Sequence, residues 1–331
     1  MTHAVFPSDP RRRFLLQSAC FLGLAGPARV RGYSGPAQLR IGFQKSAVNL
    51  VVLKQRGELE RRFPQARVQW IEFPAGPQLL EALAVGSLEF GLTGDTPPVF
   101  AQAAGKDLVY VGAEPPKPES SAILVPPDSP LRALADLKGR RIAFQKGSSS
   151  HYLVVRALRQ AGLAWKDIQP AYLTPAEARA AFERGSLDAW AIWDPYYAAT
   201  EIDLRPRVLA TGRSLSGNNS FYLASRALVE RHPEAVAALL DALVWAADHV
   251  QAHRTESAQL VAEFSGLSLA TVLRFIARRP YSPARPLDPA VVEEQQRVAD
   301  TLHEQGLIPR RIRVADAVWH PGRAALVSRS R

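Results

Sequence analysis

Short apolar runs alternate with amphipathic stretches along the chain from residue 39 onward. This alternation is typical of α/β units whose strands are parallel. The apolar runs predict strands at Leu39–Phe43, Val68–Phe73, Leu88–Leu92, Leu108–Val111, Arg141–Phe144, Ile168–Tyr172 and Ala189–Trp193. The amphipathic stretches predict helices at Leu50–Arg62, Pro77–Val85, His151–Ala161 and Pro175–Arg184, with a further short helix that begins near Pro97.

The pattern restarts near the middle of the chain. The first strand opens with Arg40-Ile-Gly-Phe-Gln-Lys45, and the strand that opens the second half begins Arg141-Ile-Ala-Phe-Gln-Lys146. Both copies of Phe-Gln-Lys stand at the end of a strand that opens its half. We therefore predict two similar α/β lobes.

Two extended segments bracket the second half of the pattern, at Ser121–Val125 and Ser220–Ala224, and we interpret them as crossovers between lobes. The chain from Pro233 to about Leu307 is largely helical and is expected to return to the first lobe. These observations assign residues 38–122 and 223–331 to the first lobe and residues 123–222 to the second. Ligands of open α/β sheets bind beyond the carboxyl ends of the strands, so the cleft between the lobes is the expected site.

The composition is that of a globular protein, and its basic residues are distributed along the chain rather than clustered. Of 331 residues, 47% are apolar and 22% are charged, and no apolar run approaches the roughly 18 residues of a membrane-spanning helix. The formal charge is +10, but no Lys/Arg-rich block with interleaved aromatic residues occurs. We therefore expect no nucleic-acid partner, and contact with a membrane only through another protein.

The N-terminal residues have the order of a secretory signal. Arg11, Arg12 and Arg13 open onto an apolar stretch, and small residues offer cleavage points after Ala28 or Ala37. The Arg-Arg-x-Phe-Leu-Leu form resembles a twin-arginine signal, which exports folded proteins. Residues 1–37 are accordingly predicted to be a cleaved signal peptide that sends the protein to the periplasm; the alternative is a folded N-terminal helix.

Cys20 is the only cysteine and lies inside that signal. A lipid anchor would need an aliphatic residue three positions earlier, where this chain has Gln17. The mature protein is therefore expected to lack a thiol, which excludes disulfides, thiolate metal sites and cysteine nucleophiles.

Gly147, Ser148, Ser149 and Ser150 form the sharpest local feature, between a predicted strand and a predicted helix. Backbone N–H groups and the positive end of a helix attract an anion there, and each serine adds a hydroxyl donor. The alternative is an ordinary helix cap, since serine is favoured at that position without any ligand. His151 follows the serines and is a further candidate of this site; it is expected to orient or pack, and the alternative is a direct contact with the ligand.

A second candidate follows another strand, at Thr93, Gly94 and Asp95. A carboxylate would repel a bound anion, so Asp95 is expected to cap its own helix and leave Thr93 and Gly94 for the ligand. If Asp95 instead faces the cleft, the ligand should also carry a positive group.

Further candidates stand at other strand ends. Gln44 offers a neutral donor, and Trp193-Asp194 closes the strand that ends at Trp193, where the indole could wall an apolar ligand tail or belong to the core. Lys45 and Lys146 are either cleft cations or surface charges.

Catalytic and metal-binding motifs are missing from the sequence. It contains no Gly-x-Ser-x-Gly, His-Glu-x-x-His or Gly-x-x-x-x-Gly-Lys-Ser/Thr motif, and its 7 His are scattered. The serines beside His151 do not form a nucleophile and base, because adjacent residues at a helix start seldom point at each other. We therefore expect neither an enzyme nor a metal or other cofactor.

Five longer motifs stand at or near the predicted strand ends. They are Glu72-Phe-Pro-Ala-Gly-Pro-Gln78, Thr93-Gly-Asp-x-Pro-Pro98, Tyr110-Val-Gly-x-Glu-Pro-Pro-Lys-Pro118, Phe144-Gln-Lys-Gly-Ser-Ser-Ser-His151 and Asp188-Ala-Trp-Ala-Ile-Trp-Asp-Pro-Tyr-Tyr197. Together these motifs make the chain resemble the aliphatic-sulfonate-binding proteins of bacterial ABC importers. The resemblance covers about residues 38 to 325. It implies a type II periplasmic binding fold, with two lobes of mixed sheets flanked by helices around a hinged cleft. It also implies a monomer that takes part in sulfur acquisition and delivers its ligand to a membrane permease with an ATPase.

The resemblance does not fix the ligand, because members of the family also bind other small anions. Relatives bind taurine, whose ammonium would need Asp95 or Asp194, or nitrate, which would need a smaller pocket. A related enzyme on this fold cleaves sulfinates with a cysteine nucleophile, which a chain that has lost Cys20 would not possess.

Overall fold

The computed structural model describes residues 1–3 and 35–320. Residues 4–34 of the predicted signal, with Arg11–Arg13, Cys20 and Ala28, lie outside the described residues. Residues 35–320 belong to one unit that contains two five-stranded sheets.

The first sheet, sheet A, has the strand order β2-β1-β3-β10-β4. Strand β1 pairs in parallel with β2 and β3, with Ile41 opposite both Trp70 and Phe90, whereas β10 runs antiparallel between β3 and β4. The strands of sheet A are β1 (Gln38–Phe43), β2 (Arg67–Glu72), β3 (Phe90–Gly94), β4 (Val109–Glu114) and β10 (Ser220–Ala224).

The second sheet, sheet B, repeats this plan in the order β7-β6-β8-β5-β9. Strand β6 pairs in parallel with β7 and β8, and β5 runs antiparallel between β8 and β9. Its strands are β5 (Ser121–Val125), β6 (Arg141–Phe144), β7 (Gln169–Tyr172), β8 (Ala189–Trp193) and β9 (Arg207–Thr211). The predicted fold class, mixed sheets flanked by helices in two similar lobes, is confirmed.

The two extended segments predicted as crossovers form the antiparallel strands β5 and β10. Each lies wholly within one sheet, β5 in sheet B and β10 in sheet A. The lobe boundaries predicted at residues 122/123 and 222/223 therefore fall inside strands.

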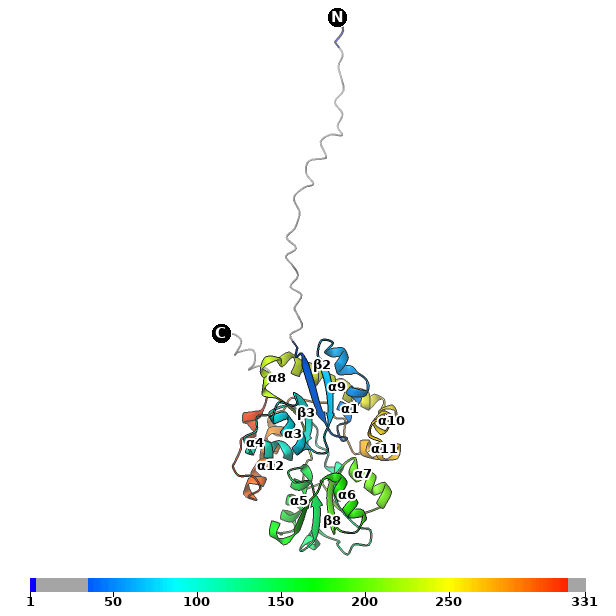
Figure 1. Ribbon diagram of the computed structural model, residues 1–331, viewed down its shortest axis with the longest axis vertical. Helices are drawn as coiled ribbons and strands as arrows, with labels where there is room; N and C mark the ends of the chain where they lie inside the picture. Colours follow the sequence, from blue (N-terminus) through cyan, green and yellow to red (C-terminus); the bar gives the residue numbers. More distant parts are fainter. Residues whose placement is uncertain (4–34, 321–331) are drawn as a thin grey trace. The chain divides into compact units, whose positions relative to one another are not determined.

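Helices flank both sheets, and those of the C-terminal part lie with sheet A (Figure 1). The predicted helix 50–62 is divided at Gly57, whose φ of 60° belongs to the left-handed region that glycine adopts without strain. In the second half, α6 begins at a capping box in which Thr174 accepts from the Glu177 amide. The helices are α1 (Val48–Gln55), α2 (Glu58–Arg62), α3 (Gly76–Ala84), α4 (Thr96–Ala103), α5 (Ser149–Gln160), α6 (Pro175–Glu183), α7 (Tyr196–Leu204), α8 (Arg226–Arg231), α9 (Pro233–Ala252), α10 (Arg254–Ser265), α11 (Leu269–Ala277) and α12 (Pro289–Glu304).

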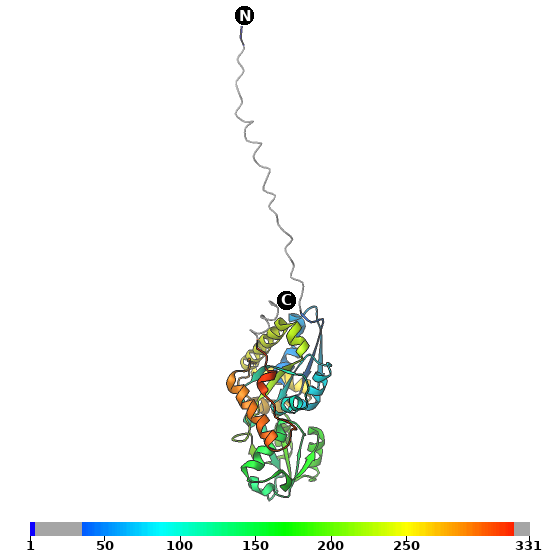
Figure 2. The same cartoon turned by 90° about the vertical axis from the view of Figure 1, so that its left-hand side faces the viewer.

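Helix α9 is long and apolar enough, by length and composition, to cross a membrane. Its buried residues include Val236, Leu239, Leu240 and Leu243, and it contacts α1, α8 and α10. A core helix of a globular protein has these properties, and we assign α9 that role. Figure 2 shows α12, in orange, along the side of the part of the molecule that contains sheet A and α9.

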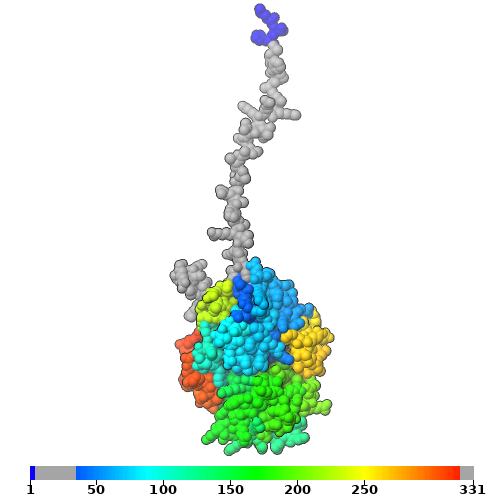
Figure 3. Space-filling model, viewed as in Figure 1, coloured from blue at the N-terminus to red at the C-terminus, as the bar shows by residue number. Residues whose placement is uncertain are grey.

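Each sheet has its own apolar core. In the first, Leu79, Leu83, Tyr110 and Phe221 belong to one buried cluster beside sheet A. Sheet B is covered on two faces by two clusters, one around Phe144 and the other around Trp190. In the space-filling view the green surface of the sheet B half meets the blue and cyan surface of the sheet A half directly (Figure 3).

Replacement of Trp190 tests the second core. Its side chain is fully buried, so Trp190→Ala leaves a large cavity and should lower the free energy of unfolding by about 3–5 kcal/mol. Val85→Ala, at an exposed apolar position, should change it by less than about 0.5 kcal/mol. Urea unfolding of both variants checks this, and equal losses would contradict the assignment of Trp190 to the core.

Candidate functional site

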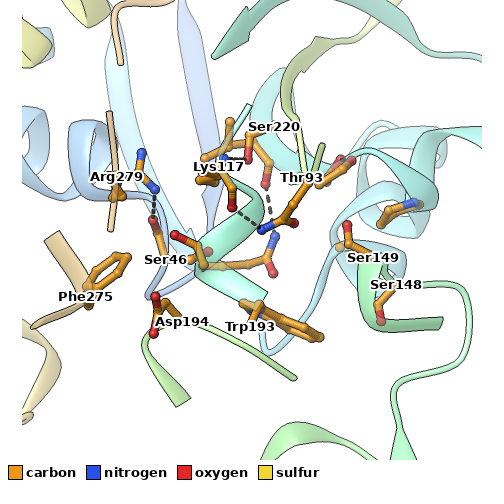
Figure 4. A pocket seen from close by; sticks show the side chains of 17 residues that line it. Ser46, Thr93, Lys117, Ser148, Ser149, Trp193, Asp194, Ser220, Phe275 and Arg279 are labelled. Atoms are coloured by element: carbon orange, nitrogen blue, oxygen red, sulfur yellow. Dashed lines mark hydrogen bonds between the residues drawn. The ribbon is translucent and has the colours of Figure 1, made fainter. Parts of the chain in front are cut away.

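A cavity lies where strand ends of sheet A meet strand ends and a helix start of sheet B. It contains about 520 Å³ of atom-free space, counted together with the part that opens to solvent. Polar side chains from both halves face it (Figure 4). Its wall includes residues after β1, β3 and β8 and the start of α5, so the expected location at the carboxyl ends of strands agrees with the structure.

The structure brings seven of the predicted site residues to this wall and leaves four outside it. The seven are Gln44, Thr93, Gly94, Ser148, Ser149, Trp193 and Asp194. The four outside the wall, each within two positions of a wall residue in sequence, are Asp95, Gly147, Ser150 and His151.

The hydroxyl groups of the serine run are occupied by neighbours within the protein. Ser148 Oγ donates to the Gln145 carbonyl at 2.7 Å and lies 2.9 Å from Ser150 Oγ. Ser148 is the N-cap residue of α5, yet its side chain makes no cap hydrogen bond. The first backbone N–H groups of α5 have no carbonyl partner within the helix, so they remain the donors that this end of the cavity offers to an anion.

Gly94 and Ser149 bring the two halves into contact. A Cβ atom on Gly94 would lie 2.1 Å from Ser149 Oγ, so no other residue fits there without movement. Ser149 in turn hydrogen-bonds the carboxylate of Asp95.

Asp95 is buried and engaged. Its carboxylate accepts from Thr96 Oγ1 at 2.8 Å and from Ser216 Oγ at 3.4 Å, and burial raises its pKa. Asp95 is the N-cap residue of α4, as expected, and its carboxylate accepts from the Thr96 backbone N–H, but its side chain makes no further cap hydrogen bond to the helix. Instead, hydroxyl groups from separate segments surround the carboxylate and compensate its burial.

The remaining candidates from sheet A are held by local contacts. Gln44 Nε2 donates to the Leu92 carbonyl at 3.2 Å, and Thr93 Oγ1 donates to the Gly94 carbonyl at 3.0 Å. Lys45 donates to the Ser265 carbonyl, and Lys146 is exposed with its Nζ 5.4 Å from the centre of the Tyr172 ring. Neither lysine lines the cavity, which favours the surface interpretation of both.

Sequence reasoning missed the two cations of the wall, Lys117 and Arg279. Lys117 Nζ lies 3.5 Å and Arg279 Nη2 lies 2.8 Å from Oε2 of Glu114. Burial opposes the ionisation of Glu114, but Arg279 and Lys117 outweigh it and hold its pKa below the ordinary value. Lys117 stands in the Tyr110–Pro118 motif, so the sequence offered a signal for it. Arg279 follows α11 in the C-terminal part of the chain, where no motif or strand end identifies it.

Other polar and apolar side chains of the wall were also missed. Ser120, Asn218 and Ser220 come from segments beside β5 and β10, and Phe275 comes from α11. Of these, Ser120 has a buried hydroxyl with no hydrogen-bond partner in the described part of the chain.

Asp194 lines the cavity but already has a counter-ion. Arg278 Nη1 donates to Asp194 Oδ1 at 3.0 Å, and the Ala198 amide donates to the same oxygen. Burial raises the pKa of Asp194 to about 7, against the opposing effect of Arg278. Arg278 also pairs with Glu201 and lies over the Tyr197 ring, 3.9 Å from its centre.

His151 packs among aromatic rings behind the serine run. Its ring centre lies 5.0 Å from that of Phe144 and 5.7 Å from that of Phe100, and Gly147 N donates to its Nδ1 at 3.2 Å. Burial, with a smaller effect of Lys146, lowers its pKa to about 4. The contacts are those of the packing and orienting role expected for it.

Within residues 1–3 and 35–320, no group of three or more His, Cys, Asp or Glu side chains is placed to hold a metal ion. The wall holds one carboxylate, Asp194, which is paired with Arg278, and its other polar groups are amide, hydroxyl and cationic groups, which suit an anion rather than a metal.

Comparison with known proteins gives close relatives over nearly the whole chain. The sequence model of the family described as NMT1/THI5 like matches residues 68–257. A protein of Escherichia coli (strain K12) named as an aliphatic sulfonates-binding protein is 47% identical over 305 residues, which are 91% of this chain and 96% of that protein.

Two solved structures are similar in both sequence and fold. The alkanesulfonate-binding protein SsuA from Xanthomonas axonopodis pv. citri, bound to MOPS, has 50% identity and a TM-score of 0.84, and the match covers 86% of this chain and 99% of that one. The periplasmic aliphatic sulphonate binding protein SsuA from Escherichia coli has 48% identity and a TM-score of 0.80, over 87% of this chain and 93% of that one.

Gly94→Ala tests the contact between the halves. The new methyl group would turn the Ser149 hydroxyl away and deprive buried Asp95 of a hydrogen bond, so the free energy of unfolding should fall by about 1–3 kcal/mol. Ser149→Ala breaks the same bond, so the double variant should be about as stable as Ser149→Ala alone. Urea unfolding measures all three, and fully additive losses would refute the contact.

His151 should make stability depend on pH in the acid range. Its folded-state pKa is about 4 against 6.5 in the unfolded chain, so between these values the unfolded chain binds a proton that the folded chain does not. The free energy of unfolding should therefore decrease as the pH falls from 6.5 to 4, by up to roughly 3 kcal/mol. His151→Phe should remove this part of the slope in a series of urea titrations; identical slopes in both proteins would contradict it.

Proposed function

Because this chain belongs to the NMT1/THI5-like family and, within it, to the aliphatic-sulfonate-binding proteins, we propose that it captures aliphatic sulfonates in the cavity and delivers them to an ABC import system. The observation that carries the proposal is the donor set of the wall. The start of α5 with its backbone N–H groups, buried Lys117 and Arg279, and the Ser120 hydroxyl, which has no hydrogen-bond partner among residues 1–3 and 35–320, belong to the wall of one cavity.

The chemistry of a sulfonate suits this set of donors. A sulfonate is ionised at every physiological pH and offers three acceptor oxygens with no proton to donate. Donors of the wall can therefore point at the sulfonate without meeting a proton on it. Trp193 and Phe275 add apolar surface for a carbon tail.

The alternative ligands fit the wall less well. The ammonium group of taurine needs a carboxylate, but Asp194 is paired with Arg278 and Asp95 is enclosed by hydroxyl groups. Nitrate has no tail for the apolar surface. An enzyme of the cysteine-dependent kind would need a nucleophile, and the only cysteine of the chain is Cys20. The relatives described above are named as binding proteins.

The proposal includes export and a membrane partner. The order of basic, apolar and small residues ahead of Ala28 and Ala37 supports a twin-arginine signal that is removed in the periplasm. The protein then acts as a monomer that meets the permease and its ATPase at the membrane.

Calorimetry on the exported protein tests the function. Methanesulfonate and butanesulfonate should bind with a Kd in the micromolar range or tighter, and taurine, nitrate and sulfate should bind more weakly. The physical reason is that only a sulfonate combines one negative charge, three acceptor oxygens and an apolar tail. Binding of nitrate without binding of either alkanesulfonate would overturn the assignment.

A further inference from the structure

Two buried cations of the cavity wall share one carboxylate. Lys117 and Arg279 are each 7% exposed, and both pair with the same oxygen of Glu114. One carboxylate neutralises one cation, so this cluster keeps a single positive charge in excess. A buried charge without a counter-ion is costly, and a ligand that supplies the missing charge is correspondingly favoured.

The other acidic groups near the cluster do not supply that charge. Asp194 interacts with Arg279 at longer range but forms its ion pair with Arg278. Asp95 likewise interacts with Lys117 at longer range, whereas the ion pairs of Lys117 and Arg279 in the described part of the chain are with Glu114. The carboxylate of Asp95 is bonded to Thr96, Ser216 and Ser149, and burial raises its pKa against the opposing effect of these bonds and of Lys117. Tyr222 donates its hydroxyl to Glu114 at 2.8 Å and brings no charge.

Two hydrogen-bond donors beside the cluster also have protons that no acceptor of the described residues uses. The Ser120 hydroxyl is buried in the cavity wall without a partner among the described residues. Lys117 Nζ donates to Ser220 Oγ at 2.5 Å and reaches Glu114, which leaves one of its three protons for another acceptor. Figure 4 places Lys117, Ser220 and Arg279 on one side of the cavity and Ser148 and Ser149 on the other. At that opposite side the serine hydroxyls are already bonded within the protein.

We propose that the Lys117–Arg279 pair, held by Glu114, is the specificity determinant of this site, and that its one excess charge selects monoanionic headgroups such as sulfonates over the dianion sulfate. A dianion would leave one negative charge buried in the cluster, whereas a neutral ligand would leave one positive charge. The inference rests on the proposed function and names the residues that give it its selectivity.

Lys117→Gln tests the role of the Lys117–Arg279 pair in binding. Removal of the excess charge, together with one charge-assisted donor, should raise the Kd of methanesulfonate by about 10- to 100-fold in calorimetry. Lys146→Gln is the matched control, since it removes one exposed positive charge at the start of α5 and should change the Kd by less than about 2-fold. Equal affinities of Lys117→Gln and the unchanged protein would overturn the inference.

Glu114→Gln tests the same proposal by removing the negative charge of the cluster instead of a positive one. It raises the excess charge of the cluster from one to two, so the ratio of the sulfate Kd to the methanesulfonate Kd should fall by about 10-fold or more. An unchanged ratio in a folded variant would contradict selection by charge.

The unchanged protein provides a test that needs no variant. Burial lowers the pKa of Lys117 to about 8, against the opposing effect of Glu114, and a bound anion favours the charged ammonium. Above pH 8 binding must therefore take up a proton, and the affinity for methanesulfonate should fall by up to about 10-fold per pH unit. Asp194, with a pKa of about 7, titrates below this window.

The outcomes separate this inference from the proposed function. A flat affinity between pH 8 and about 10, or the same slope in Lys117→Gln as in the unchanged protein, would overturn the role of Lys117 while leaving sulfonate binding intact. If the unchanged protein binds no alkanesulfonate at any pH, the proposed function itself fails.

Discussion

The buried carboxylate of Glu114 connects parts of the chain that are far apart in sequence. It accepts hydrogen bonds from Tyr222 of β10 at 2.8 Å, from Asn49 of α1 at 3.3 Å and from Arg279 beyond α11 at 2.8 Å. Removal of one partner from such a cluster leaves a buried charge, which typically costs about 3–5 kcal/mol. Glu114 therefore both fastens the C-terminal helices to sheet A and sets the positions of the cations in the cavity wall.

Much of the fold could be predicted because most strands are buried on both faces. Strands β3 and β4 are buried along nearly their whole length, so they stand out as apolar runs. Strand β9 was missed, since it is a half-buried edge strand whose apolar run, Val208 to Ala210, is only three residues long. The partners of β5 and β10 could not be predicted, because each is inserted antiparallel between strands by tertiary contacts that leave no local pattern.

The candidate site was predictable as far as it lies directly after strands. Gln44, Thr93, Ser149 and Asp194 were found in that way and line the cavity. The sequence left open whether Asp95 faces the ligand. Sequence spacing could not decide this, because Ser216, which donates a hydrogen bond to Asp95, lies in a loop 121 positions away. Arg279 was missed for a related reason, because its ion pair with Glu114, 165 positions away, forms only when the chain has returned to sheet A. Lys117 was missed although it stands three residues after Glu114, inside a motif quoted from the sequence.

The insertion of β10 has a consequence for the order in which the protein folds. All strands of sheet B come from the continuous stretch between residues 121 and 211, whereas sheet A pairs Ser220 with both Gly94 and Glu114. During synthesis the second lobe can therefore assemble while β3 and β4 still lack the strand that joins them. Such non-local pairing is slow relative to local contacts. The N-terminal lobe, although it emerges first, is the one that must wait.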